Sequence, residues 1–212
     1  MKDIAIYGAG GFGREVVCLI NLINEKEPTW NLIGFFDDGK EKGSRNEYGA
    51  VLGGLDDLNA YDKPLAIAIA IGNPTYIKKV AEGTINPNIS FPNIIAPTTT
   101  FLDEKNITFG KGNIICSHCL FSCNIKIGDF NIFNGYITVG HDTVIGNYNS
   151  IMPAVRISGE VKIGESNFMG VSSVILQQIK IGNNTTIGAN SLIIKKTKDG
   201  NTYIGNPAYS IT

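Results

Sequence analysis

Every sixth residue of the C-terminal half of the chain is apolar, without exception over fifteen positions. The series is Phe109, Ile115, Phe121, Ile127, Phe133, Val139, Ile145, Ile151, Ile157, Ile163, Met169, Ile175, Ile181, Ile187 and Ile193. A helix repeats its apolar positions about every 3.6 residues and a strand every second residue, whereas stacked hexapeptide coils repeat them every sixth. An Ile-Gly pair also recurs every eighteen residues, from Ile127-Gly128 to Ile181-Gly182. Three hexads therefore form one coil, a triangle with a short strand on each side.

The position two residues before each apolar site mostly carries a small or β-branched side chain. This set is Ile107, Cys119, Ile125, Ile137, Val155, Val161, Ser173, Thr185 and Ser191. Such side chains fit the tight corner of a coil. A prism of stacked coils has two open ends that must be covered. We expect the N-terminal part of the chain to cap one end and residues 195–212 the other.

The N-terminal part has a different pattern, in which strands and helices alternate. The apolar runs predict strands over residues 4–7, 32–36 and 65–71, and helices from about residue 14 and over residues 75–82. The third strand, rich in Ala and Ile, is typical of a strand covered on both faces. This is a small parallel α/β domain, too short for a complete two-lobed dinucleotide fold.

Prolines separate the two patterns. Pro87, Pro92 and Pro97 lie in residues 86–100, just before the hexads begin. The sequence therefore predicts two domains, an α/β domain over residues 1–85 and a β-helix with a capping tail over residues 86–212. Residues 38–51, rich in Gly, Lys, Glu and Asn, are interpreted as a surface loop, or alternatively a mobile lid.

Composition narrows the range of functions. The net charge of −1 gives no electrostatic basis for binding nucleic acid or an anionic membrane. The N-terminus is not typical of a signal peptide, and no apolar stretch approaches the roughly 18 residues that a membrane span needs. Four cysteines without a secretory context predict reduced thiols and a cytoplasmic protein.

Several motifs, taken in order along the chain, resemble one enzyme family. They are Gly8-Ala9-Gly10-Gly11-Phe12-Gly13-Arg14-Glu15, Gly34-Phe35-Phe36-Asp37-Asp38, Ile71-Gly72-Asn73, Ile132-Phe133-Asn134, Gly140-His141-Asp142-Thr143-Val144-Ile145-Gly146, Ser158-Gly159-Glu160-Val161-Lys162-Ile163-Gly164 and Gly205-Asn206-Pro207-Ala208. Over nearly its whole length the chain resembles the hexapeptide-repeat sugar acetyltransferases, which include sialic acid O-acetyltransferases and UDP-4-amino-sugar N-acetyltransferases. The resemblance implies a left-handed β-helix, a Rossmann-like N-terminal half, a homotrimer with acetyl-CoA between neighbouring chains, and a role in surface-glycan biosynthesis.

His141 and Asp142 are the candidate catalytic residues. Acetyl transfer needs a base for the proton of the attacking amine or hydroxyl, and imidazole, with an ordinary pKa near 6.5, suits this at neutral pH. The resemblance makes His141 this base and Asp142 the carboxylate that holds it. Neighbouring residues on a strand face opposite ways, so the two side chains meet only if the chain turns there. The alternative is an exposed histidine without a role.

The resemblance also assigns residues to acetyl-CoA. The backbone N–H of Gly159 becomes the donor to the oxyanion of the reacting acetyl group. Gly170 and Ala189 match positions that line the pantetheine and adenine groove, although each is equally explained as a coil corner. The tail that closes over the groove contains Ile204, Gly205 and Pro207. Ser150 is a departure, because many relatives carry there a second histidine that contacts the acetyl group or the substrate.

The acceptor residues come from the N-terminal glycine turn and the strand ends. Bare N–H groups at a helix N-terminus bind phosphate, so Gly10 and Gly11 are interpreted as phosphate contacts. Asp37 and Asp38 are candidates for the nucleoside. The resemblance adds three further substrate positions, which are Gly72, Asn73 and Asn134. A bound NAD, or a purely structural turn, is the alternative reading of these glycines.

The expected reaction is acetyl transfer from acetyl-CoA to the amine of a nucleotide-linked 4-amino sugar, by direct attack. The alternatives are O-acetylation of a sialic acid and a non-catalytic nucleotide-binding module. A zinc carbonic anhydrase on the same prism needs three histidines, and the chain has only His118 and His141. Cys116, Cys119 and Cys123 allow a zinc site or an acetyl-cysteine, but close-packed corners explain them and no metal is expected.

Overall fold

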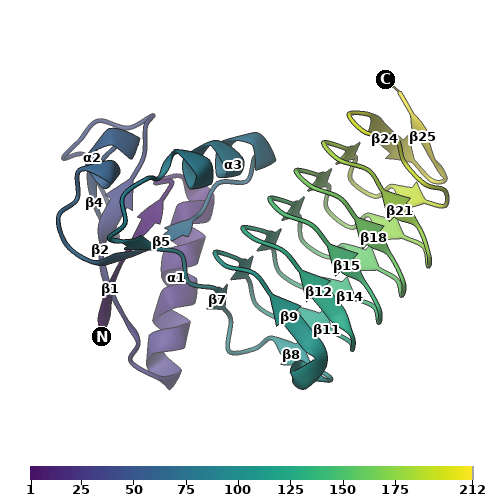
Figure 1. The fold of residues 1–212 in the computed structure, drawn as a ribbon, viewed down its shortest axis with the longest axis horizontal. Coiled ribbons are helices and arrows are strands. Elements are labelled where there is room, and N and C mark those ends of the chain that lie inside the picture. Colours follow the sequence, from purple (N-terminus) through teal and green to yellow (C-terminus); the bar gives the residue numbers. More distant parts are fainter. Residues whose placement is uncertain (212) are drawn as a thin grey trace.

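The computed structural model describes residues 1–211, which form an α/β domain followed by a triangular prism of stacked coils (Figure 1). The sheet of the α/β domain has the order β3-β4-β2-β1-β5-β6. Its strands are β1 (Lys2–Tyr7), β2 (Trp30–Phe36), β3 (Arg45–Asn46), β4 (Gly49–Gly53), β5 (Leu65–Ile69) and β6 (Ile89–Ser90). Its helices are α1 (Gly11–Lys26), α2 (Leu55–Asn59) and α3 (Pro74–Gly83). All pairings are parallel except that of β3 with β4.

The predicted strands and the two predicted helices are present, and their apolar residues are buried between sheet and helices. β5 is buried at all five of its positions, as its Ala/Ile composition indicated. α1 places Val16, Val17 and Ile20 against the sheet. The interpretation of residues 38–51 as a loop or lid is wrong for its second half, which forms the β3–β4 hairpin. Val51 is buried there and β4 pairs with β2, so this segment belongs to the sheet.

The prism consists of three parallel sheets, one for each side of the triangle, and the chain visits them in turn. We call them sheets C, D and E. Sheet C contains β7 (Ile94–Ile95), β10 (Ile114–Ile115), β13 (Ile132–Phe133), β16 (Ser150–Ile151), β19 (Phe168–Met169), β22 (Thr186–Ile187), β24 (Thr202–Gly205) and the antiparallel β25 (Ala208–Ser210). Sheet D contains β8 (Thr100–Phe101), β11 (Leu120–Phe121), β14 (Thr138–Val139), β17 (Arg156–Ile157), β20 (Val174–Ile175) and β23 (Leu192–Ile193). Sheet E contains β9 (Ile107–Phe109), β12 (Ile125–Ile127), β15 (Val144–Ile145), β18 (Lys162–Ile163) and β21 (Lys180–Ile181), and the 3₁₀ turn η1 (Glu104–Asn106) precedes β9.

A left-handed backbone conformation at every sixth residue turns the chain at each corner. Thirteen non-glycine residues, from His118 to Asn190, have φ between 52° and 64°. Even aromatic residues such as Tyr136 and Tyr148 adopt it, although it is costly for residues with a Cβ. The apolar series points inward and fills the prism. The small or β-branched residues two positions before each apolar site are also buried, so they pack inside the coils; Ile107 and Ile125 begin strands β9 and β12.

An asparagine ladder runs inside the edge between sheets E and C. Asn113, Asn131, Asn149 and Asn167 are fully buried and eighteen residues apart. The Nδ2 of each of the last three donates to the Oδ1 of the residue one coil before, at 2.9–3.1 Å. Each Oδ1 also accepts the backbone N–H of the next rung. Because a buried amide must be paired, this ladder favours one register of the coils. The same eighteen-residue spacing was visible in the sequence.

The two domains share a core along the outer face of sheet C. Ile114 packs with α1 in one apolar cluster, and Ile132 packs with Ile77 of α3 in another. We expected the α/β domain to cap an end of the prism; its apolar contact is with this face. At the other end, the tail adds the β24–β25 hairpin to sheet C, and Tyr203 packs against the core. Within residues 1–211, no helix is long and apolar enough to cross a membrane.

Candidate active site

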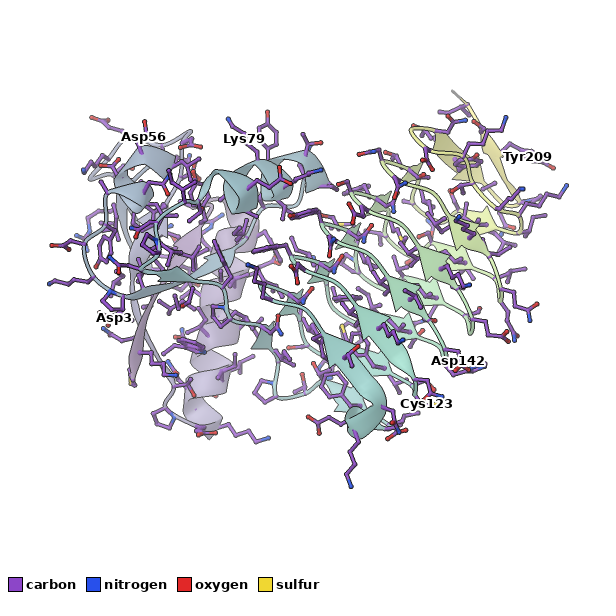
Figure 2. All side chains as sticks on the ribbon, viewed as in Figure 1. Asp3, Asp56, Lys79, Cys123, Asp142 and Tyr209 are labelled. Atoms are coloured by element: carbon purple, nitrogen blue, oxygen red, sulfur yellow. The ribbon has the colours of Figure 1, made fainter. Side chains whose placement is uncertain are left out.

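His141 and Asp142 meet at the edge between sheets D and E. Asp142 has φ of 57°, so the chain turns between the two residues and their side chains point the same way. His141 Nδ1 lies 2.7 Å from Asp142 Oδ2. The other oxygen, Oδ1, accepts from Asn124 Nδ2 at 3.2 Å. These contacts, with that of His141 first, lower the pKa of the Asp142 carboxyl. Both side chains are about half exposed (47% and 50%), so the site faces outward, as Asp142 in Figure 2 shows.

Gly159 lies directly against the His141 ring, one coil further on. A Cβ at this position would be 2.5 Å from His141 Nε2, so only glycine leaves room for the imidazole. Since Nδ1 is turned to Asp142, Nε2 is the nitrogen left for a substrate. The N–H of Gly159 donates to no other group in the described part of the chain. A ring nitrogen and an unused backbone donor therefore lie side by side.

At the corresponding turns of the edge between sheets E and C, three backbone donors are capped by side chains of the next coil. There the side chains of Asp129, Asn147 and Asn183 each accept the backbone N–H of the residue eighteen positions earlier, one coil before. The turns that follow His141 along its own edge have Gly159 and Gln177 at the equivalent places. Glycine has no side chain, and the side chain of Gln177 accepts no such bond, since its amide donates to Glu160. The backbone N–H of Gly159 is therefore left uncapped.

The residues expected to line acetyl-CoA lie on a different edge of the same chain, between sheets C and D. A Cβ on Gly170 would lie 2.5 Å from the N atom of Ala189, so these two residues are neighbours along the edge. A Cβ on Gly188 would lie 3.0 Å from Ile204 Cγ1, which brings the tail to the same place. Gly205 donates its N–H to Ser191 Oγ at 3.1 Å. Gly170, Ala189, Ile204 and Gly205 are therefore brought together, and Pro207 follows in the same hairpin turn.

Two predicted residues are not brought to His141 within one chain. Ser150 lies on sheet C, is completely buried, and its hydroxyl has no partner among residues 1–211. Asn134 lies on the edge between sheets C and D, where its Oδ1 accepts the N–H of Gly135 at 2.8 Å. It lines a cavity of about 400 Å³ together with Glu15, Cys18 and His118. Any contact of Asn134 with the sugar near His141 therefore requires a second chain.

The four glycines of the N-terminal turn divide into two kinds. A Cβ on Gly13 would lie 1.9 Å from the carbonyl oxygen of Gly8, and Gly8 has φ of +110° with Ala70 O close by. These two glycines allow α1 to pack against the ends of β1 and β5. Gly10 and Gly11 have no atom within 4 Å of a Cβ. They face open space at the N-terminus of α1, as a phosphate cradle requires.

A cavity of about 440 Å³ lies over this turn, at the carboxyl ends of the strands. Its lining includes Gly10, Gly11, Asp37, Asp38 and Gly72, which are five of the predicted substrate residues. The carboxylate of Asp37 is already occupied, because it accepts the N–H groups of Ala9 and Gly39, both at 2.8 Å. Asp38 accepts from Leu55 N–H at 2.8 Å. Asn73 caps α3 by accepting from Thr75 N–H and lines the adjoining cavity.

Three residues of this cavity were missed in the sequence. Tyr76 and Lys79 project from α3, and the signal for them was their position on the helix that follows the third strand. The hydroxyl of Tyr7 is buried at the cavity with no hydrogen-bond partner among residues 1–211. Burial, and then the nearby Asp38, raise the pKa of Tyr7. A neutral hydroxyl next to Asp38 and a lysine from α3 thus line the same cavity.

The two kinds of glycine lead to a testable difference. Replacing Gly13 with alanine is expected to lower the melting temperature by at least several degrees, because the new methyl meets the Gly8 carbonyl. Gly11→Ala is the matched control and should melt within about a degree of the wild type. Thermal unfolding followed by circular dichroism measures both. Equal melting temperatures of the two variants would contradict the distinction between a close-packed Gly13 and an open Gly11.

The cysteine cluster has the features of packed corners. Burial raises the pKa of the Cys116 thiol to about 12 and that of Cys119 to about 11. Such thiols are poor nucleophiles and poor metal ligands at neutral pH. Within residues 1–211, no group of three or more His, Cys, Asp or Glu side chains is placed to hold a metal. Cys123 lies one coil before His141, whereas the imidazole lies against the coil after it.

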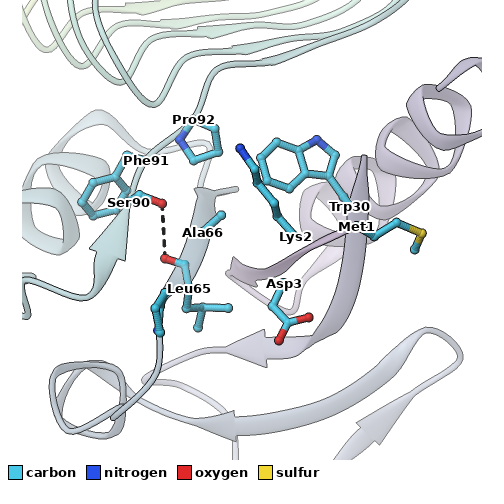
Figure 3. A pocket seen from close by; sticks show the side chains of 10 residues that line it. Met1, Lys2, Asp3, Trp30, Leu65, Ala66, Ser90, Phe91 and Pro92 are labelled. Carbon is cyan, nitrogen blue, oxygen red and sulfur yellow. Dashed lines mark hydrogen bonds between the residues drawn. The ribbon is translucent and has the colours of Figure 1, made fainter. Parts of the chain in front are cut away.

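Another cavity, of about 560 Å³, contains none of the predicted residues. It lies at the amino ends of β1 and β5, with Lys2, Asp3 and Trp30 on one side and Phe91 and Pro92 on the other (Figure 3). Parallel sheets bind their ligands at the carboxyl ends of the strands. The glycine-turn cavity at the opposite edge is therefore the better candidate for a ligand site.

Comparison with known proteins gives a consistent result. Residues 3–83 match the PglD N-terminal domain family. The acetyltransferase domain of PglB from Neisseria gonorrhoeae FA1090 is 28% identical, with a TM-score of 0.89 and 100% of both chains covered; another structure of that domain contains acetyl coenzyme A. WeeI from Acinetobacter baumannii AYE is 30% identical over 100% of both chains, with a TM-score of 0.88.

A more distant structure shows the fold alone. PerB from Caulobacter crescentus, solved with CoA and GDP-perosamine, is 22% identical over 100% of this chain and 98% of its own, with a TM-score of 0.84. No curated protein sequence matches the chain. The full-length similarity to WeeI and PglB, together with the left-handed β-helix and its paired N-terminal domain, identifies the family. The chain belongs to the hexapeptide-repeat sugar acetyltransferases, enzymes that take their acetyl group from acetyl-CoA.

Proposed function

We propose that this enzyme acetylates the amine of a nucleotide-linked 4-amino sugar, with His141 as general base. The observation that carries the mechanism is the arrangement of His141 between Asp142 and Gly159. Asp142 holds Nδ1 at 2.7 Å, which leaves Nε2 as the basic nitrogen. Gly159 presents its unused N–H beside that nitrogen. Base and oxyanion donor are thus preorganised on one edge.

The proposed reaction is a direct transfer. His141 Nε2 accepts a proton from the acceptor amine as its nitrogen bonds to the acetyl carbonyl carbon. The Gly159 N–H stabilises the negative charge that develops on the carbonyl oxygen. The C–S bond then breaks, the carbonyl reforms, and His141 returns its proton to the departing thiolate. Direct attack is favoured over an acetyl-cysteine because the His141 ring lies against Gly159, away from the coil of Cys123.

The distribution of site residues over two edges supports a homotrimer. Sheet D lies between the edge with His141 and the edge with Gly170. If three prisms turn sheet D toward a common axis, the His141 edge of each meets the Gly170 edge of the next. The outer face of sheet D suits this role. Its side chains include half-buried Leu120, Thr138, Val174 and Leu192, with Arg156 as a charged exception.

The other two faces suit contact between chains less well. Sheet C is covered over its first coils by the α/β domain. Sheet E exposes lysines in successive or alternate coils, and Lys162 pairs directly with Lys180. Like charges opposed across a symmetry axis would repel. We therefore place acetyl-CoA in the groove between neighbouring chains, where Gly170 and Ala189 of one chain face His141 of another.

The glycine-turn cavity is proposed to bind the nucleotide. Gly10 and Gly11 offer backbone N–H groups, Lys79 offers a positive charge, and Tyr7 offers a buried neutral hydroxyl. These groups suit the diphosphate of a nucleotide sugar. PerB, of the same fold, was solved with GDP-perosamine. All four cysteines are free thiols, which is consistent with a reaction in the cytoplasm, early in the synthesis of a surface glycan.

The cavity that contains Asn134 favours an amino sugar over a sialic acid. Its carboxylate, Glu15, has no ion pair or hydrogen bond within residues 1–211. Glu15 lies one helical turn beyond Gly11, so a sugar whose diphosphate is held at the glycine turn reaches this cavity. An unpaired carboxylate accepts a hydrogen bond from the N–H of an amine and repels the carboxylate of a sialic acid.

Release of free CoA thiol from acetyl-CoA tests the proposal. The acceptors are UDP- and GDP-linked 4-amino-4,6-dideoxy sugars, sialic acid and CMP-sialic acid. We expect turnover with an amino sugar only. In Glu15→Gln, kcat/KM for that acceptor should fall about 3–30-fold while KM for acetyl-CoA stays unchanged; Glu25→Gln, at the far end of α1, is the control. Turnover of sialic acid instead would refute the assignment of the acceptor.

A further inference from the structure

A second carboxylate, Glu160, stands one coil after Asp142 on the same edge. The two residues occupy equivalent corners and have almost the same backbone conformation, with φ of 57° and 58°. Glu160 donates its N–H to the carbonyl oxygen of His141 at 2.7 Å. Its neighbour Gly159 lies against the imidazole. His141 is therefore bracketed by Asp142 in its own coil and by Glu160 in the next.

The carboxylate of Glu160 is held in place by two amides from the following coil. Gln177 Nε2 donates to Oε1 at 2.9 Å, and Gln178 Nε2 donates to Oε2 at 3.1 Å. A surface glutamate is ordinarily mobile, and fixing it costs side-chain entropy. These two hydrogen bonds, Gln177 first, lower the pKa of Glu160, and the attraction of His141 acts in the same direction. Glu160 is thus ionised and oriented at neutral pH.

The other charged and titratable groups near this edge are placed less well than Glu160 to act on the His141 ring. Arg156, on the adjoining strand of sheet D, donates to the carbonyl of Tyr136 on the opposite edge. Lys126 and Lys162 lie on the outer face of sheet E. The thiol of Cys123 belongs to the preceding coil. Asp142 and Glu160 are the two anionic groups next to the imidazole among the described residues.

We propose that Glu160 is a positioning residue whose fixed negative charge stabilises the imidazolium that forms on His141 during acetyl transfer. This rests on the proposed role of His141 as base. When His141 accepts the amine proton, it becomes positive between two carboxylates. Asp142 holds the ring through Nδ1, while Glu160 supplies charge from the coil on which the oxyanion donor also lies. Successive coils stack roughly 4.8 Å apart, a separation at which opposite charges attract appreciably even near a surface.

The pH dependence of Glu160→Gln tests this proposal. Loss of the charge makes the imidazolium less stable. The acid limb of the kcat/KM profile should therefore move about half a unit to lower pH, and kcat on the plateau should fall about 3–10-fold. Glu160→Asp, which keeps the charge, should retain most of the acid limb. Glu165→Gln is the matched control, because Glu165 also accepts from an amide, Asn147 Nδ2, but on another edge.

Melting temperatures of all three variants establish that the folded enzyme is being compared. A Glu160→Gln enzyme with an unshifted acid limb and wild-type kcat would overturn the proposal. So would an equal shift in Glu165→Gln, since the effect would then be one of general surface charge. Failure of the underlying function is recognised separately, because His141→Ala would then retain its activity whatever Glu160 does.

Discussion

Replacement of His141 with alanine is expected to lower kcat by about 10²–10⁴-fold, a barrier increase of roughly 3–5 kcal/mol. The acceptor amine then has no base at the position that Asp142 orients and Gly159 adjoins. KM for acetyl-CoA should change little, since the residues expected to bind it lie on another edge. Release of CoA thiol at saturating amino sugar measures kcat directly.

The only other histidine provides the control. His118 stacks on Tyr136, with ring centroids 4.9 Å apart, on the edge between sheets C and D. His118→Ala should keep kcat at saturating amino sugar within about threefold of the wild type, because no proton transfer is assigned to it. Since His118 lines the cavity of Asn134 and Glu15, its effect is expected on KM for the acceptor instead. A His141→Ala enzyme that turned over at the wild-type rate would exclude the base mechanism. Equal losses of kcat in both variants would contradict the assignment of the proton transfer to His141 alone.

Replacement of Val174 with aspartate is expected to convert a trimer into monomers and to abolish activity. Val174 lies on β20, next to the last strand of sheet D, where it pairs with Arg156 on one side and Leu192 on the other. Three aspartates brought together around one axis would repel each other and would lose water, a cost that the neighbouring Arg156 offsets only in part. Each chain would then keep His141 but lose the neighbouring edge with Gly170. Activity should fall to background, at least about 10³-fold, since a separated chain has half of the site.

Sedimentation velocity at micromolar concentration measures the assembly, and circular dichroism checks that the prism is intact. Lys180→Asp is the matched control, because Lys180 occupies the equivalent outward position on sheet E. It should remain trimeric and active. A wild-type protein that sediments as a monomer would refute the shared site. An active monomeric Val174→Asp variant would show that one chain contains the whole site.

The sequence alone was sufficient for the fold of the C-terminal half. The six-residue period predicted stacked coils, and the eighteen-residue recurrence of the Ile-Gly pair predicted three strands in each coil. Both follow from the requirement that every coil place an apolar residue inward at the same point of each strand. The structure shows that the chain turns at the corners by placing residues such as Tyr136 and Asp142 in the left-handed conformation, with positive φ. That conformation carries little sequence signal, because most of these corners are not glycine.

The site was predicted residue by residue, but not its arrangement. The meeting of His141 and Asp142 depended on a turn that strand geometry alone does not provide. The roles of the four N-terminal glycines became distinct only when the packing of Gly8 against Gly13 was known. Ser150 was expected near the acetyl group, yet sheet C places it in the interior of the contact region. The burial of Ser150 depends on tertiary packing, which the residues around position 150 do not reveal.

Local sequence therefore determined the period, the strands, the inward face and the candidate base, because these depend on the order of apolar and polar residues. Tertiary structure decided which corner residues of different coils lie next to one another. Residues eighteen apart lie on one edge, whereas residues nine apart, such as His141 and Ser150, lie on different sides of the triangle. Proximity in the prism follows from the closing of each coil on itself. The bracketing of His141 by Asp142 and Glu160 exists only once the coils have stacked.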